Sequence, residues 1–146
     1  MIFQRLEAQV CRDEGFRAAP YLDTVGVATI GYGSIRINGR PVTLDDKPVS
    51  EPTAREMMRS ELYESCINAQ KMFTRFDRMS HVRQECLVNM AYNLGPTRLR
   101  GFKKLIAAAE SMNYSEMAVQ AKDSKWFDQV GQRAIRICNA LETGVW

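Results

Sequence analysis

The stretch EGFRAAPYLDTVGVATIGYG, residues 14–33, marks the change from a helical to a strand pattern along this chain. Before it, apolar residues recur at helical spacing, at positions 2, 3, 6, 10 and 11. Gly15 follows this pattern and is a typical helix C-cap, so Glu14 is expected at the end of the helix. From Tyr21 onward β-branched and aromatic residues alternate with glycines, which predicts strands with a turn at residues 23–26.

Downstream, the sequence predicts one hairpin and a series of helices. Asn38-Gly39 lies between two short apolar stretches and favours a two-residue hairpin, giving an antiparallel sheet of about three short strands. A helix begins either at Ser50, acting as its cap, or one turn later at the capping box Thr53–Glu56. Apolar spacing predicts further helices over residues 80–94, 102–111, 115–122 and 132–141. The pattern indicates an α+β protein that is mostly helical.

The 146 residues suit a single domain, 1–146, of ordinary globular composition. We expect a small β lobe over about residues 15–50 and a larger helical lobe from residues 1–14 and 51–146. No apolar run approaches the ~18 residues of a membrane span, and the N-terminus has no apolar signal core. We therefore expect no signal peptide, no signal-anchor and no stable membrane insertion, and synthesis in the cytoplasm. The net charge of +3 suits an anionic polymer as partner.

The chain has four cysteines, which are far apart in sequence and form no CxxC pair, and its one histidine is His81. This pattern predicts no metal site and no cofactor. Two disulfides are arithmetically possible. Without a secretory signal, four reduced thiols packed as small apolar side chains are the favoured interpretation.

Two carboxylates in the opening stretch can supply the two functions that glycoside hydrolysis requires. That reaction needs a protonated acid for the leaving oxygen and a second carboxylate on the other face of the sugar. Glu14 lies at a helix C-terminus, where the helix dipole favours the protonated form, whereas Asp23 lies in a polar turn that suits an anion. The hydroxyl of Thr29 could hold a water. By themselves, a helix-end glutamate and a turn aspartate are also common in proteins without this chemistry.

The order of these residues closely resembles the active-site signature of the phage-type lysozymes, the endolysins of glycoside hydrolase family 24. The resemblance is carried by Glu14-Gly15, Tyr21-Leu-Asp23-Thr-Val-Gly26 and Thr29-Ile-Gly-Tyr-Gly33, without gaps. Further matches are Asn89-Met-Ala-Tyr-Asn-Leu-Gly95, Gly101-Phe102, Ser124-Lys-Trp-Phe127, Arg133-Ala and Thr143-Gly-Val-Trp146. The resemblance implies a lysozyme-like fold with an active-site cleft between the two lobes.

The same resemblance implies roles for individual residues. Glu14 is the expected general acid, Asp23 the carboxylate that activates water, and Thr29 its partner in holding that water. Arg133 matches an arginine that fixes the catalytic glutamate. The implied outcome is inversion, which places the carboxyls roughly 6.5–9.5 Å apart so that water fits between them.

Substrate contacts are expected at five further positions, where the match is looser: Ile35, Tyr92, Asn93, Leu105 and Gln120. Leu105 stands where relatives have a polar contact. Ser34 follows Gly-Tyr-Gly where many relatives have a histidine that can pair with an acid, so this chain cannot form that pair and its acid stability is expected to differ.

The function implied is hydrolysis of the β-1,4 bond between N-acetylmuramic acid and N-acetylglucosamine in bacterial peptidoglycan, for host cell lysis. We expect a monomer that waits in the host cytoplasm, needs a holin to reach the wall, and binds no nucleic acid. Three rivals remain: a lytic transglycosylase, a non-catalytic wall-binding module, and a basic nucleic-acid binder. The basic stretch at Arg98, Arg100, Lys103 and Lys104 is expected to be solvated, with approach to the anionic wall as a lesser hypothesis.

Overall fold

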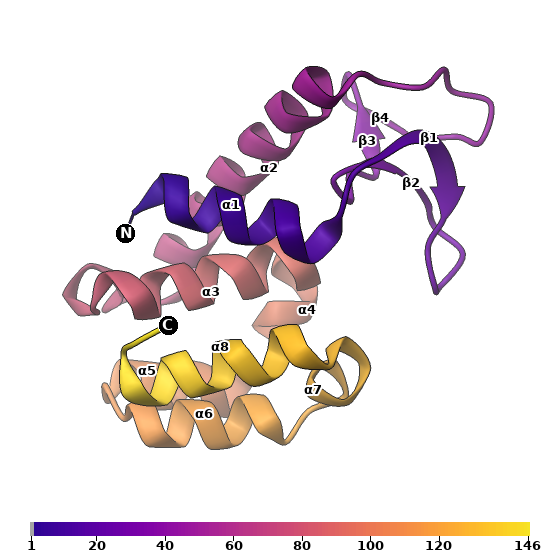
Figure 1. The fold of residues 1–146 in the computed structure, drawn as a ribbon. Helices are drawn as coiled ribbons and strands as arrows, with labels where there is room; N and C mark the ends of the chain where they lie inside the picture. The colour runs from indigo at the N-terminus through magenta and orange to yellow at the C-terminus, as the bar shows by residue number, and fades with distance from the viewer. Residues whose placement is uncertain (1) are drawn as a thin grey trace. The chain divides into compact units, whose positions relative to one another are not determined.

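The computed structural model describes residues 2–146 (Figure 1). Eight α-helices and four short strands make up this part of the chain, together with one 3₁₀ turn, Phe76–Arg78. The helices are α1 Phe3–Glu14, α2 Glu51–Met72, α3 His81–Leu94, α4 Pro96–Arg100, α5 Lys103–Glu110, α6 Tyr114–Lys122, α7 Lys125–Val130 and α8 Gln132–Thr143. The strands are β1 Arg17–Leu22, β2 Ala28–Gly31, β3 Arg36–Ile37 and β4 Arg40–Pro41. The mostly helical α+β fold predicted from the sequence is confirmed.

The chain divides into two compact units. The N-terminal unit comprises residues 4–63, which hold most of α1, all four strands and the first part of α2. The helical unit comprises residues 64–146 with Ile2 and Phe3. In the helical unit α6 packs against both α5 and α8, and α3 packs against α8. The β lobe predicted over residues 15–50 lies wholly within the N-terminal unit.

The prediction of one sheet of about three strands is wrong, because the strands form two separate antiparallel pairs, β1–β2 and β3–β4. The division falls at residues 31–34, where Gly31 and Gly33 have φ values of +65° and +81°. These left-handed conformations suit glycine and turn the chain sharply, so that Ile30 pairs back with Ser34 and β2 ends. The Asn38-Gly39 hairpin is confirmed, with both residues at positive φ as a type I′ turn requires.

The helix ends follow local capping chemistry. The N–H of Gly15 donates to the Cys11 carbonyl at 2.9 Å, and Gly15 has a φ of +71°, so the predicted C-cap of α1 is confirmed. The alternatives for the start of α2 are resolved in favour of Ser50, whose Oγ accepts from the N–H of Thr53 at 3.3 Å. Ser80 caps α3 in the same way.

Two short helices were not predicted. Gly95-Pro96 does end α3, but Pro96 is also the first residue of α4. Proline suits that position because it has no N–H to leave unsatisfied there. The other short helix, α7, buries Trp126, whose side chain is 2% exposed. Trp126 is therefore part of the core of the helical unit.

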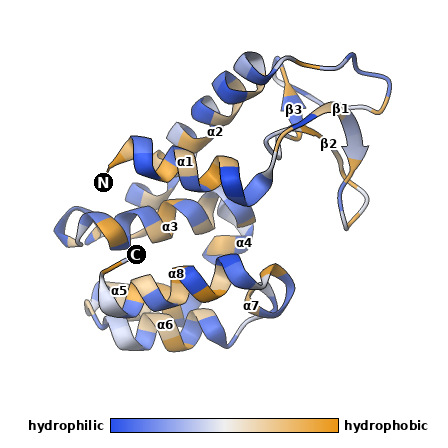
Figure 2. Cartoon of the chain, viewed as in Figure 1, coloured by the Kyte–Doolittle hydropathy of each residue, from blue (hydrophilic) through white to orange (hydrophobic). Residues whose placement is uncertain are grey.

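Hydrophobic and hydrophilic residues alternate along α1 and α8 (Figure 2), and the buried residues of each of these helices recur at helical spacing. Met58, Met79 and Met90 are among the buried apolar residues. All four cysteines are free thiols. Among residues 2–146, no helix combines the length and apolar character needed to span a membrane.

Candidate active site

Glu14 ends α1 with its side chain against the glycine-rich turn that follows β2. Its Oε2 lies 2.7 Å from the point at which a Cβ on Gly33 would stand, and its Cδ lies 3.0 Å from that point. The backbone of Gly33 therefore forms one wall of the space that the carboxylate occupies. A side chain at this position would have to displace the carboxylate.

Asp23 is held by the turn that joins β1 to β2. Its Oδ1 accepts the N–H groups of Val25 at 2.9 Å and Val27 at 2.8 Å. The N–H of Gly26 donates to the Asp23 carbonyl, which confirms the predicted turn. Within residues 2–146 the structure gives Oδ2 no hydrogen bond to protein. One carboxylate oxygen thus fixes the side chain, and the other has its acceptor capacity available.

Thr29 lies on β2 and is 4% exposed. Its Oγ1 donates to the Val27 carbonyl at 2.9 Å. Because the hydroxyl proton is committed to that carbonyl, the oxygen presents only acceptor lone pairs to any further partner. Val27 thus orders both side chains, since its N–H binds Asp23 and its carbonyl binds Thr29.

Tyr21 pairs with Thr29 and has a pKa that responds to the charges of Glu14 and Asp23. It is the cross-strand partner of Thr29 in the β1–β2 ladder. Burial raises the pKa of its phenol, and the negative charges of Glu14 and Asp23 raise that pKa further, while Arg17 opposes them. The two carboxylates therefore both act electrostatically on one side chain of the N-terminal unit.

A polar network anchors the glycine-rich segment to α2. The Tyr32 hydroxyl donates to Glu51 Oε1 at 2.8 Å, and Arg55 donates to the same carboxylate oxygen at 2.6 Å. Arg55 also reaches Glu7 on α1 at 3.3 Å, where Glu7 accepts a second bond from Arg59 at 2.8 Å. Hydrogen bonds thus join α2 both to Tyr32, which precedes Gly33, and to α1, which ends at Glu14.

Ser34 makes its own contact with an acid. Its side chain is buried, and its Oγ donates to Glu61 Oε2 on α2 at 2.9 Å. A hydroxyl carries no charge that titrates, so this contact differs in kind from the histidine–acid pair of the relatives. The expectation that Ser34 removes the ionic pair holds, but the position still binds a carboxylate.

In the helical unit, two predicted site residues, Asn93 and Arg133, are held by hydrogen bonds that join α3 to α7 and α8. Asn93 Oδ1 accepts the indole N–H of Trp126 at 2.8 Å, and Asn89 Oδ1 accepts Arg133 Nε at 2.9 Å. Arg133 is 8% exposed, so its guanidinium is fixed within this unit. Tyr92, which precedes Asn93, is half-buried.

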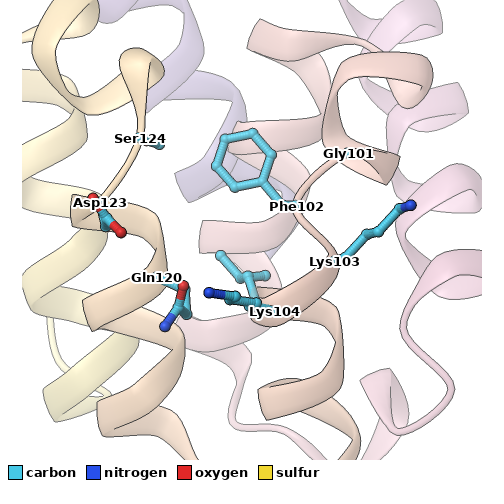
Figure 3. A pocket seen from close by; sticks show the side chains of 8 residues that line it. Gly101, Phe102, Lys103, Lys104, Gln120, Asp123 and Ser124 are labelled. Carbon is cyan, nitrogen blue, oxygen red and sulfur yellow. The ribbon is translucent and has the colours of Figure 1, made fainter.

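A pocket of about 400 Å³ lies between α5 and α6 in the helical unit (Figure 3). Its walls include Gln120 and Asp123 on one side and Phe102 on the other. The Lys104 side chain extends toward the wall formed by Gln120, whereas Lys103 extends away from that wall. Leu105 also lines the pocket but is 0% exposed. The pocket offers amide, ammonium and carboxylate groups around an aromatic ring.

Comparison with known proteins identifies the family. Residues 12–139 match the family model described as phage lysozyme. This chain belongs to the phage lysozyme family. Two relatives from Dictyostelium discoideum, named probable T4-type lysozymes 2 and 1, are 28% and 26% identical, each covering 90% of both chains. A further match, at 26% identity, is the pre-baseplate central spike protein Gp5 of Enterobacteria phage T4, of which the alignment covers 27%.

The solved structures bear out the fold of this phage lysozyme. An endolysin from Escherichia coli O157:H7 phage FAHEc1 superposes with a TM-score of 0.81, covering 100% of this chain and 96% of that chain at 20% identity. The predicted lysozyme-like fold is confirmed. As a member of this family the protein is a glycoside hydrolase, a lysozyme that acts on peptidoglycan.

Within this phage lysozyme the predicted site residues fall into two sets. Glu14, Asp23, Thr29 and Ile35 lie in the N-terminal unit, and Tyr92, Asn93, Leu105, Gln120 and Arg133 lie in the helical unit. Ile35 is 49% exposed, just past the glycine-rich turn. The pairing of Arg133 with Glu14 joins residues of different units and stays a prediction.

Sequence reasoning did not single out Arg17, Tyr21 or Phe102 for this site. Tyr21 could have been found from the strand pattern, because it is two residues before Asp23, at the end of β1. Phe102 follows a glycine in a loop, where sequence alone gives no sign of a pocket.

Proposed function

We propose that this lysozyme hydrolyses the β-1,4 bond between N-acetylmuramic acid and N-acetylglucosamine, with inversion at the anomeric carbon. The observation that carries the proposal is the arrangement of Asp23 and Thr29 around Val27. Asp23 keeps Oδ2 available as an acceptor, and Thr29 Oγ1 has committed its proton. Two acceptors of this kind can take both protons of one water and leave its lone pair for attack.

The reaction would proceed in one displacement. Protonated Glu14 gives its proton to the glycosidic oxygen as the bond from that oxygen to the anomeric carbon breaks. Water held by Asp23 and Thr29 attacks the anomeric carbon from the opposite face and gives a proton to Asp23. The products are a free hydroxyl on the leaving sugar and an inverted hemiacetal. Glu14 is then ionised and Asp23 protonated, and exchange with solvent restores both.

The helical unit would hold the rest of the substrate. We propose contacts to peptidoglycan from Tyr92, Asn93 and Gln120, and from Ile35 in the N-terminal unit, with Arg133 fixing Glu14. Gln120 is supported by its place in the wall of the pocket. Leu105 is fully buried, so it would support the shape of the pocket and touch substrate only after a side-chain movement.

The variant that tests the proposal is Glu14→Gln, which keeps the size of the side chain but cannot donate a carboxylic proton. We expect a folded protein that clears a peptidoglycan suspension at least about a hundredfold more slowly, as loss of a general acid predicts. NMR of the first product sugars should show the inverted anomer before mutarotation. Anhydro sugars would indicate a transglycosylase, and clearance by Glu14→Gln at the normal rate would remove Glu14 from the mechanism.

For the biological role, we propose a single-domain, monomeric endolysin that lyses the host after a holin opens the membrane. Membership of the phage lysozyme family supports this role. Expression in bacterial cytoplasm should be tolerated until a pore-forming protein is induced, and should then cause lysis. Lysis without the pore former would contradict holin dependence, and sedimentation at twice the monomer mass would contradict the monomer.

A further inference from the structure

We propose that Arg55 on α2 is a positioning residue of the catalytic centre. It joins α1, which ends at Glu14, to the glycine-rich turn against which the Glu14 carboxylate lies, and thereby fixes the acid in the place that proton transfer needs. The inference rests on the proposed function, since it concerns the same acid.

The contact that Arg55 would fix lies between the end of α1 and the turn after β2. The Oε2 atom of Glu14 is 2.7 Å from the point where a Cβ on Gly33 would stand. Phe16 follows Glu14 by two residues and Tyr32 directly precedes Gly33, and the centres of their rings are 5.5 Å apart. The place of the carboxylate therefore depends on how α1 and this turn are held relative to each other.

On the side of the turn, Arg55 holds Tyr32 through Glu51. The Tyr32 hydroxyl donates to Glu51 Oε1 at 2.8 Å, and the same oxygen accepts Arg55 Nε at 2.9 Å and Nη2 at 2.6 Å. The guanidinium carbon also lies 5.8 Å from the centre of the Tyr32 ring, within the range of a cation–π attraction. Because two N–H groups of one planar guanidinium converge on the oxygen that Tyr32 binds, its orientation is tied to that of the turn.

On the side of α1, the remaining nitrogen of the same guanidinium reaches two residues of the helix. Arg55 Nη1 donates to Glu7 Oε1 at 3.3 Å and to the sulfur of Cys11 at 3.8 Å. Glu7 and Cys11 precede Glu14 by seven and three residues, so they lie two turns and about one turn before it on the same side of the helix. One side chain thus contacts both the helix that carries the acid and the group that holds the turn.

Arg59 forms a simple ion pair between the same two helices. It lies one turn further along α2 and donates to Glu7 Oε2 at 2.8 Å. Among residues 2–146 the structure records no bond from Arg59 to Glu51 or Tyr32. Arg59 therefore joins α1 to α2 without reaching the turn, whereas Arg55 joins all three segments.

Loss of the Arg55 contacts should displace the acid without unfolding the protein. Glu7 keeps its bond from Arg59, and the Glu51 side chain is 38% exposed, so neither carboxylate is left buried and unpaired. A misplacement of about 1 Å in a reacting group can lower a rate by up to about a hundredfold. The value of kcat should therefore fall, and KM should change little, because none of the proposed substrate contacts involves Arg55.

The test compares Arg55→Met with Arg59→Met, which removes the same charge and one bond to Glu7 from the same helix. The measurements are kcat and KM for peptidoglycan hydrolysis, at the pH optimum of each variant and below the melting temperatures of both. We expect kcat to fall about tenfold in Arg55→Met and to stay within about twofold in Arg59→Met, with KM within about twofold in both. Equal kcat values for the two variants, or a raised KM at constant kcat in Arg55→Met, would overturn the inference.

A double-mutant cycle with Tyr32→Phe tests the connection through Glu51. This variant keeps the ring but removes the hydroxyl that binds Glu51. Alone, or combined with Arg59→Met, it should lower kcat several-fold. Combined with Arg55→Met it should lower kcat by less than a further twofold or so, because the connection is already broken. A full effect of Tyr32→Phe in the Arg55→Met background would show that the two residues act separately, contrary to the inference.

Glu14→Gln separates a failure of this inference from a failure of the proposed function. If Glu14→Gln is inactive while Arg55→Met keeps the wild-type kcat, only the role of Arg55 is wrong. Full activity of Glu14→Gln would instead remove the proposed function.

Discussion

The carboxylate of Glu14 fills the space in which a side chain on Gly33 would stand, with Oε2 2.7 Å from the position of that Cβ. Real Cβ atoms essentially never approach a heavy atom so closely. Gly33 also has a φ of +81°, which L side chains rarely adopt. The glycine therefore serves two purposes, a sharp turn after β2 and room for the proposed acid.

Gly33→Ala should accordingly abolish most activity by displacing Glu14. The matched control is Gly39→Ala in the β3–β4 hairpin, because Gly39 has a similar φ of +77° but nothing within 4 Å of its would-be Cβ. Both variants should lose about 1–2 kcal/mol of stability from left-handed strain. Only Gly33→Ala should also lose activity. The measurement is a clearance assay at a temperature below the melting temperatures of both variants. Equal activities would show that Glu14 is not confined by Gly33.

The sequence predicts best those parts of the site that depend on residues close together in the chain. The placement of Glu14, Asp23 and Thr29 in one compact unit follows from an ordered string of about 20 residues. The contact of the Arg17 guanidinium with the Tyr21 ring does not follow from the sequence, because in a regular strand these two side chains would be far apart. The contact between Arg17 and Tyr21 depends on how β1 pairs with β2, and no local sequence pattern predicts that pairing.

The same reasoning applies to the fold. Helix ends at Gly15 and Ser50 depend on neighbouring residues, so capping rules predicted them. Whether β3 and β4 join the first sheet depends on the course of the chain after Gly33, which local propensity does not predict. Pro96 is ambiguous in a different way, because a proline that follows one helix can also begin the next.

Asp23→Asn and Asp23→Ala should separate the structural role of Asp23 from its chemical one. The amide oxygen of Asn can still accept the N–H groups of Val25 and Val27, so the turn should persist. Ala removes both bonds and should cost about 1–2 kcal/mol of stability. Clearance should fall roughly a hundredfold or more in both, because neither can take a proton from water. Substantial activity in Asp23→Asn would contradict the proposed role of the carboxylate.

Glu51 should make stability depend on pH. The hydrogen bond from Tyr32, and then that from Arg55, lower the pKa of its carboxyl. A lowered pKa in the folded state stabilises the protein above the ordinary carboxyl range, roughly pH 4, and this contribution is lost as the pH falls below it. The melting temperature of Glu51→Gln should therefore lie below that of wild type at pH 7 and converge with it near pH 2. Glu56→Gln, an exposed neighbour on α2, is the control. A difference that stays constant with pH would show that the contact does not titrate.

The pocket between α5 and α6 predicts a difference between two adjacent lysines. Lys104 extends toward the wall formed by Gln120, whereas Lys103 extends away from it. If the pocket receives an anionic part of peptidoglycan, Lys104→Gln should raise KM several-fold and leave kcat nearly unchanged, because a binding charge is lost without touching the chemistry. Lys103→Gln removes an equal net charge and should change KM by less than about twofold. The difference in KM between Lys104→Gln and wild type should shrink as the salt concentration is raised from 0.05 to 0.5 M. Screening weakens the attraction between Lys104 and an anionic substrate in wild type. Equal KM values for the two variants would mean that net charge alone attracts the wall and that the pocket does not bind it.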